Sequence, residues 1–220
     1  MERFLFFYSV MNSGKSTSLI QKAYNYEECG KQIVVLKPNQ DTKIEDSIST
    51  RIGLNRKVDI LIGENDSVLE ELKNYMINNQ KLVDCVFVEE AQFLNRKQVD
   101  ELSVAANFLD IEVICYGLRI DFAQNGFEGS DRLLQKATLI PMETKCLCCG
   151  EDAANNARKI NGEYVKDGAQ VSIDGVDSEY DSLCEVCYAK KVLGIEPEEI
   201  KKEFQKQIVM GIHKSLYVNN

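Results

Sequence analysis

Short apolar runs alternate with amphipathic stretches along the chain as far as residue 143. Continuous apolar runs predict strands that are buried on both faces of a sheet, and apolar residues at helical spacing predict helices that pack on that sheet. We expect strands in the first half of 4–17 and at 33–36, 59–62, 83–88, 112–117 and 138–143, and helices at 16–28, 66–75, 95–109 and 131–137. Asp66 is the expected cap of the second helix. The polar stretch 41–56 is expected to be a long loop.

This alternation predicts an α/β fold with a mostly parallel sheet and helices on both faces. We expect 1–143 to form the main domain, 144–192 to form a small module around two cysteine pairs, and 193–220 to form a C-terminal helix and tail. The helix is expected at 197–211. Its apolar side is either core or an oligomer contact, and consists of Ile200, Phe204, Ile208 and Val209.

Composition narrows the classes of function. The chain has 220 residues, 44% of them hydrophobic, which is enough for one good core and a small additional module. A net charge of −9 at pH 7 argues against a surface that holds nucleic acid phosphates. No apolar run reaches the roughly 18 residues that a membrane span needs. Because the first strand begins directly after Met1, we expect a cytoplasmic protein without a signal peptide.

A phosphate-binding loop is predicted where the first strand ends. A helix start, loop amides and a lysine ammonium converge there, which suits the phosphates of a nucleoside triphosphate, with the Ser16 hydroxyl on the accompanying magnesium. The usual first glycine is Ser9 here, and the alternative is an ordinary strand-to-helix turn. The expected phosphate contacts are Ser9, Met11, Asn12, Ser13, Gly14, Lys15, Ser16 and Thr17.

Two adjacent carboxylates, Glu89 and Glu90, directly follow an apolar run. Such a pair is costly to bury unless it binds something positive, so the alternative is a solvated strand end. In nucleotide-binding α/β proteins this tip lies beside the phosphate loop, where an acid binds magnesium. Because ligands lie outside the carboxyl ends of parallel strands, we expect one cleft lined by 9–16, 89–93 and 118–127.

Eight cysteines are present, and Cys29, Cys85 and Cys115 are scattered singly, as expected for core packing. Four others form two close pairs whose spacing lets four thiolates surround one zinc ion. The expected ligands are Cys146, Cys149, Cys184 and Cys187. The alternative is a pair of disulfides, which a reducing compartment disfavours.

The remaining cysteine, Cys148, is a spare that competes with its neighbours for the metal. The stretch 151–183 between the pairs carries many acids and few bases, so a structural clamp is favoured over a nucleic-acid reader. We expect zinc to pin the ends of an otherwise floppy loop, so that 171–175 and Tyr180 close over the cleft.

The chain resembles the thymidine kinase family with a P-loop and a zinc ribbon. The segments that carry this resemblance are 9–17, FVEEAQF at 87–93, YGLRIDFAQNGF at 116–127 and the two cysteine pairs. The resemblance covers about 4–188. It implies a RecA-like sheet, a zinc-ribbon module with a lasso loop over the nucleoside, and transfer of the γ-phosphoryl of ATP to the 5′-hydroxyl of thymidine, and of deoxyuridine, with Mg²⁺ in nucleotide salvage. It also implies a homotetramer inhibited by dTTP.

The resemblance assigns roles to individual positions. Lys15 and Ser16 match the family's contacts to phosphate and magnesium. Glu89 occupies the position of the acidic residue that binds magnesium, and Glu90 matches the general base. A sugar hydroxyl is a poor nucleophile near neutral pH, so a carboxylate that takes its proton is needed. The positions that match the nucleoside site are Phe93, Leu118, Phe122, Phe127, Val171, Ile173 and Tyr180.

Departures from the family pattern keep other interpretations open. The chain has Glu89 and Ala91 where the family has aspartate and glycine, and 174–176 reads Asp-Gly-Val where it has a glycine pair. One alternative is a kinase for a different deoxynucleoside, which comparing thymidine, deoxyuridine and deoxycytidine would reveal. Others are a nucleotide-binding homologue with weakened catalysis and a zinc-ribbon nucleic-acid binder, which predicts salt-sensitive retention of DNA or RNA.

Overall fold

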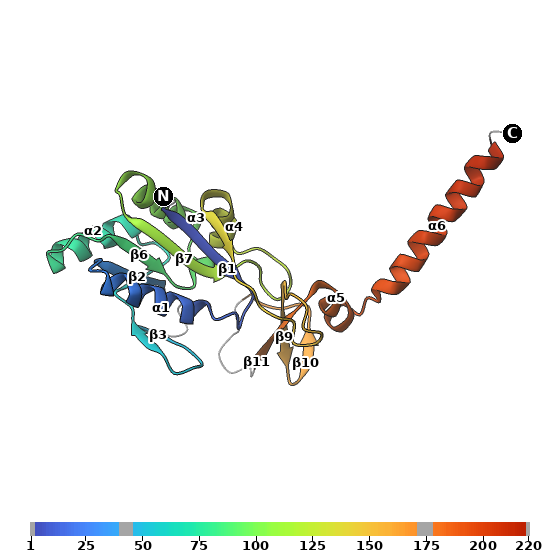
Figure 1. The fold of residues 1–220 in the computed structure, drawn as a ribbon, viewed down its shortest axis with the longest axis horizontal. Coiled ribbons are helices and arrows are strands. Elements are labelled where there is room, and N and C mark those ends of the chain that lie inside the picture. Colours follow the sequence, from blue (N-terminus) through green and yellow to red (C-terminus); the bar gives the residue numbers. More distant parts are fainter. Residues whose placement is uncertain (1–2, 40–45, 171–177, 219–220) are drawn as a thin grey trace.

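A six-stranded parallel sheet forms the centre of the protein (Figure 1). The computed structural model describes residues 3–39, 46–170 and 178–218, with side chains up to Met210. The strands are β1 Phe4–Ser9, β2 Ile33–Pro38, β5 Ile60–Ile62, β6 Cys85–Val88, β7 Glu112–Leu118 and β8 Thr138–Pro141. They run in the order β5-β2-β6-β7-β1-β8, and every neighbouring pair is parallel. The expected α/β class and its six strands are confirmed.

Helices cover both faces of this sheet, as the alternation predicted. The helix α1 (Lys15–Glu28) packs Leu19 and Ala23 on one face. On the other face, Leu72, Leu102 and Leu133 come from α2 (Val68–Asn79), α3 (Arg96–Phe108) and α4 (Glu128–Lys136). Successive strand residues point to opposite faces, so the central strands must be apolar at every position, which is why they read as continuous runs.

The expectation of a long loop at 41–56 is wrong for residues 46–56, the part of this stretch that the structure describes. Ser47–Ser49 (β3) and Asn55–Lys57 (β4) pair as an antiparallel hairpin. Ile48 is buried among the side chains on the α1 face of the sheet, which explains an isolated isoleucine in a polar stretch. Because such short strands hold few ladder bonds, tertiary packing decides this hairpin and local pattern does not predict it.

The cap of α2 is Ser67, and the expectation that Asp66 caps this helix is wrong. Ser67 Oγ accepts a hydrogen bond from the Glu70 N–H at 3.3 Å. Asp66 instead accepts one from the Gly63 N–H at 2.8 Å, which closes the turn before the helix. Both residue types serve as caps, so sequence alone does not choose between neighbours.

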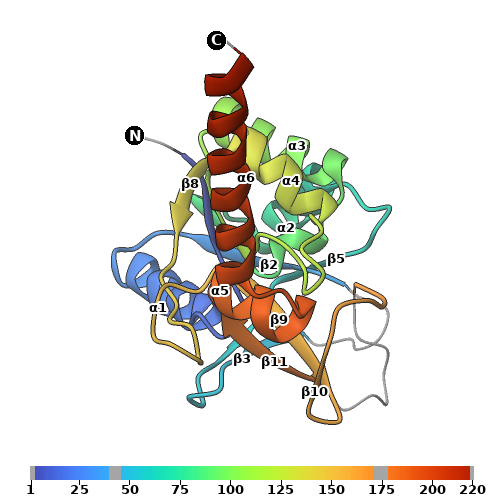
Figure 2. The same cartoon turned by 90° about the vertical axis from the view of Figure 1, so that its right-hand side faces the viewer.

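The late module contains a second, antiparallel sheet. Its strands β9 (Asn155–Ile160), β10 (Glu163–Val165) and β11 (Ser178–Leu183) run in the order β10-β9-β11. Figures 1 and 2 place this sheet beyond the carboxyl end of β1. The expectation of a floppy loop across 151–183 is therefore wrong for its described part, and the expected closing segment 171–175 lies outside the described residues.

The module has its own small core and is joined to the main domain. Ala157, Leu183 and Tyr188 pack around Cys146 and Cys184. Tyr188 belongs to the short helix α5 (Glu185–Tyr188), which continues as η2 (Ala189–Leu193). The Tyr188 hydroxyl donates a hydrogen bond to the Phe122 carbonyl at 2.6 Å, and this bond joins the module to the main domain.

The C-terminal helix α6 (Pro197–Val218) stands clear of the body in Figure 1 and is longer than expected. Ile200 and Phe204 are 59% and 63% exposed, so the apolar side of this helix is not part of the core of this chain. Within the described part of the chain, none of the helices combines the length and the apolarity that crossing a bilayer requires.

Candidate active site

The loop between β1 and α1 forms a cradle around the Lys15 side chain. Gly14 has a φ of +77°, a left-handed conformation that glycine adopts without steric cost, and α1 begins at the next residue. The Lys15 ammonium donates hydrogen bonds to the Val10 carbonyl at 2.7 Å and to Ser13 Oγ at 3.2 Å. Loop, lysine and helix start therefore converge, as the sequence predicted.

Ser9 lies at the end of β1 and points away from this cradle. Its hydroxyl donates to the Met142 carbonyl at 2.6 Å and lies 3.2 Å from Thr144 Oγ1. The side chain that replaces the usual glycine is thus accommodated beside the segment that follows β8. Ser9 is the one expected phosphate contact that does not line the cavity described below.

Glu89 is buried directly beneath the phosphate loop. It is 4% exposed, and its Oε1 accepts a hydrogen bond from the Ser16 hydroxyl. Burial, reinforced by the adjacent Glu90 carboxylate, raises the pKa of Glu89 to about 7. Its Oε2 has no hydrogen-bond partner among the described residues. A buried carboxylate oxygen without a partner, next to a hydroxyl, is a donor set that suits a hard cation such as Mg²⁺.

Glu90 faces the same space as Lys15. Its φ of +50° places it in the left-handed region, which is rare for a residue other than glycine, and the short turn η1 (Ala91–Phe93) follows it. Its carboxylate accepts a hydrogen bond from Gln92 Nε2. Burial lowers the pKa of the Lys15 ammonium, while Glu90 and Glu89 act in the opposite direction.

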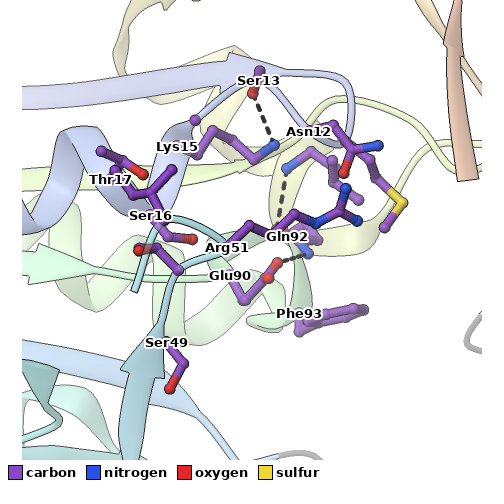
Figure 3. A pocket seen from close by; sticks show the side chains of 15 residues that line it. Asn12, Ser13, Lys15, Ser16, Thr17, Ser49, Arg51, Glu90, Gln92 and Phe93 are labelled. Atoms are coloured by element: carbon purple, nitrogen blue, oxygen red, sulfur yellow. Dashed lines mark hydrogen bonds between the residues drawn. The ribbon is translucent and has the colours of Figure 1, made fainter. Parts of the chain in front are cut away.

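A cavity of about 480 Å³ joins these groups. Figure 3 shows Lys15 and Ser16 on one side of it and Glu90, Gln92 and Phe93 on the other. Segments distant in the chain supply its walls, because the carboxyl ends of parallel strands meet at one edge of the sheet. The lining residues are Met11, Asn12, Ser13, Gly14, Lys15, Ser16, Thr17, Ser49, Thr50, Arg51, Ile52, Glu90, Gln92, Phe93 and Leu118.

One group of lining residues was not expected from the sequence. Ser49 to Ile52 come from the β3–β4 hairpin, and Arg51 brings a second cation to the cavity. The only signal for it was an arginine in a polar stretch. Gln92 lies within the expected lining segment 89–93, but the sequence assigned it no role of its own, and only the fold shows that it is buried.

The expected nucleoside residues divide into three sets. Phe93 and Leu118 line the cavity, and Phe93 meets Phe127 edge-on at 5.6 Å between ring centroids. These two rings also border a second hollow of about 440 Å³. Val171 and Ile173 lie outside the described residues.

Phe122 and Tyr180 do not line the main cavity. Phe122 is buried under the Arg158 guanidinium, which lies 3.7 Å from the ring centroid. Tyr180 belongs to β11, and its carbonyl accepts a hydrogen bond from Asn12 Nδ2 at 3.0 Å. These two residues therefore connect the small sheet to the cavity walls.

The small sheet also holds the phosphate loop from behind. The Met11 N–H donates to Asn156 Oδ1 at 2.7 Å, and the Met11 carbonyl accepts from the Ser182 hydroxyl at 2.7 Å. Asn156 and Ser182 are both buried, on β9 and β11. The late module is thus part of the site's support.

The four expected cysteine ligands come together. The sulfurs of Cys146, Cys149, Cys184 and Cys187 lie within 4.8 Å of one another, and all four are free thiols. This arrangement can hold a metal, and an all-sulfur set favours zinc. Cys148 is exposed and is not part of the cluster.

A strand, a glycine-lysine-serine loop and a helix on a parallel sheet, with an acid at the end of β6, one strand removed from β1, define a P-loop nucleotide-binding α/β protein. The family model described as thymidine kinase matches residues 3–188. The chain belongs to the thymidine kinase family, and is an enzyme of that class.

Curated relatives agree with this family. The thymidine kinase of Rhodopirellula baltica is 39% identical over 195 residues, which are 87% of this chain and 90% of that protein. The thymidine kinase of Pasteurella multocida is 39% identical over 196 residues, covering 87% of this chain and 99% of that protein. The thymidine kinase of Xanthomonas axonopodis pv. citri is 39% identical over 206 residues, which are 91% of this chain and 97% of that protein.

Proposed function

We propose that the enzyme transfers the γ-phosphoryl of ATP to the 5′-hydroxyl of thymidine, and of deoxyuridine, to give the nucleoside monophosphate and ADP in cytoplasmic nucleotide salvage. The observation that carries this proposal is the cavity shared by Lys15 and Glu90. One side offers a cation and loop amides to phosphates, and the other offers a carboxylate to an alcohol. Phosphoryl transfer needs both within one enclosed space.

At the phosphate end, the backbone of 11–17 binds the phosphate oxygens and the Lys15 ammonium stabilises charge on the transferring group. The loss of solvent around Lys15 strengthens this interaction. Ser16 and Glu89 would hold Mg²⁺, which supplies charge neutralisation for the phosphates. A magnesium role also accounts for the Glu89 oxygen that lacks a partner among the described residues.

At the nucleoside end, Glu90 accepts the proton of the 5′-hydroxyl as general base. Phe93, Leu118 and Phe127 provide apolar and aromatic surface for the base and sugar. Phe122 and Tyr180 support this wall from behind, and Val171 and Ile173 would contact the base. Excluding water at this end prevents the loss of the phosphoryl group to hydrolysis.

The domain division that we propose follows the two sheets. Residues 1–143 bind the nucleotide, 144–192 form the zinc-ribbon and lasso module that closes over the nucleoside, and 193–220 form the C-terminal helix and tail. Zinc at the four cysteines would be structural, holding the ends of the small sheet together. We further propose a homotetramer and feedback inhibition by dTTP, with no nucleic acid or membrane partner.

The test is Glu90→Gln, which keeps the size of the side chain and removes the base. We expect turnover to fall by about 10² to 10⁴ with little change in ATP binding. Thymidine-dependent ADP release measures turnover, and titration with a non-hydrolysable ATP analogue measures binding. Glu28→Gln, at an exposed carboxylate on α1, is the control and should behave as the wild type. Near-normal turnover in Glu90→Gln would remove Glu90 from this role.

A further inference from the structure

Gln92 lies between the Glu90 carboxylate and the end of β7, and none of the roles above uses it. It is 2% exposed. Its Nε2 donates a hydrogen bond to Glu90 Oε2, and its Oε1 accepts one from the Leu118 N–H at 3.1 Å. Because Leu118 N–H needs an acceptor, the amide nitrogen must face Glu90. The side chain therefore connects the carboxylate to the backbone of the central sheet in one orientation.

Two glycines make room for the turn that carries Gln92. A Cβ on Gly117 would lie 2.8 Å from Gln92 Oε1 and 3.1 Å from the Gln92 backbone nitrogen. A Cβ on Gly129 would lie 2.6 Å from the carbonyl oxygens of Ala91 and Leu94. At Gly129 the close atoms are backbone oxygens, which cannot move aside, whereas at Gly117 the closest atom is the end of the Gln92 side chain, which an added methyl group would displace. The turn 91–94 is thus packed between β7 and the start of α4, and Gln92 is closely confined there.

Without the hydrogen bond from Gln92, the Glu90 carboxylate would be free to pair with Lys15. The Lys15 ammonium lines the same cavity and attracts Glu90 electrostatically. A carboxylate drawn to Lys15 would leave the sugar hydroxyl and would also reduce the positive charge available to phosphate. Figure 3 shows Gln92 beside the Glu90 carboxylate, with the hydrogen bond between the two side chains drawn as a dashed line.

We propose that Gln92 is a positioning residue for phosphoryl transfer, which holds the Glu90 carboxylate toward the nucleoside hydroxyl and away from Lys15. This inference rests on the proposed role of Glu90 as general base. Gln92 acts through Glu90, so its loss lowers kcat and leaves the KM for ATP nearly unchanged. A residue that only supported the fold would lower both stability and activity together.

Gln92→Leu removes both hydrogen bonds and keeps most of the volume. We expect kcat to fall about 10-fold to 100-fold, the size of effect that a small misplacement of a reacting group produces. Gly117→Ala displaces the glutamine without altering its chemistry, and we expect a kcat defect of the same kind. Val99→Ala, a truncation in the core on α3, is the control for lost stability, with a lower Tm and a normal kcat.

The outcomes separate this inference from the function on which it rests. A normal kcat in Gln92→Leu and Gly117→Ala, with Glu90→Gln inactive, overturns the positioning role and leaves the general base in place. A kcat loss no larger than that of Val99→Ala at equal Tm also overturns it. Full turnover in Glu90→Gln would overturn both the general-base role of Glu90 and the positioning role of Gln92. A large kcat loss at constant KM for ATP in Gln92→Leu and Gly117→Ala, with a Tm no lower than that of Val99→Ala, supports the proposal.

Discussion

The Met11 N–H in the phosphate loop donates to the side-chain oxygen of Asn156, 145 residues further along the chain, at 2.7 Å. The amide nitrogen of Asn156 donates to the Ile120 carbonyl at 2.8 Å. One buried side chain thus joins the phosphate loop, the small sheet and the segment after β7. Asn156 therefore fixes the position of the phosphate loop relative to the segment that follows β7.

Removing this connection should weaken both stability and nucleotide binding. In Asn156→Leu, the Met11 N–H and the Ile120 carbonyl lose their partner, which costs about 1–3 kcal/mol of unfolding free energy. We expect a higher Kd for ATP as well, because the loop loses a support. Urea denaturation and nucleotide titration measure these effects. Asn107→Ala, on the exposed side of α3, should leave the Kd unchanged, and an equal Kd in both variants would contradict this account.

Arg51 should contribute to turnover although no sequence pattern identified it. It lines the same cavity as the phosphate loop and comes from the β3–β4 hairpin. A cation near a transferring phosphoryl group stabilises the charge that develops there. We expect Arg51→Ala to lower kcat at least about tenfold. Steady-state kinetics would show this, and Lys57→Ala on the same hairpin is the matched control; identical kinetics in the two variants would exclude the role.

Cys149→Ser should weaken metal retention. A serine hydroxyl is a poor replacement for a thiolate ligand, so the variant should retain less than one zinc per chain after dialysis against a chelator and should melt at a lower temperature. Elemental analysis and thermal melting measure the two effects. Cys148→Ser is the control, because this exposed thiol lies outside the cluster. Full zinc occupancy in Cys149→Ser would show that the ligand set is wrong.

The ion pair between Arg56 and Glu27 should add stability that depends on pH. Arg56 donates to both Glu27 oxygens, at 2.9 Å and 2.7 Å, and ties the hairpin to α1. These hydrogen bonds hold the pKa of Glu27 below its usual range. The stabilisation is therefore fully present above the unfolded-state pKa and is lost as pH falls through the folded-state pKa.

Glu27→Gln measures this contribution. Because the Glu27 side chain is 43% exposed, we expect a loss of about 0.2–1 kcal/mol near pH 7, and almost none in strong acid. Urea denaturation of both proteins across this pH range provides the comparison. A difference that stays constant with pH would mean that packing, and not charge, accounts for it.

Local pattern predicted the elements of the main domain well, because each central strand is apolar on both faces and each helix has one apolar side. It failed at Ile48, whose burial depends on a hairpin that only tertiary packing stabilises. It also failed across 151–183, where β9 and β11 pair although residues 161–177 separate them in the sequence. Long-range pairing leaves little trace in a local window.

The amino-acid sequence by itself determined the parallel sheet, the phosphate loop, the acid pair and the two cysteine pairs, because the residue types and spacings that these features need are local. Only the tertiary structure decided that Ser9 faces away from the loop, that Arg51 lines the cavity, that Gln92 donates a hydrogen bond to Glu90, and that Asn156 accepts one from the phosphate loop. These relations depend on which segments meet at the carboxyl edge of the sheet, and that is a property of the whole chain.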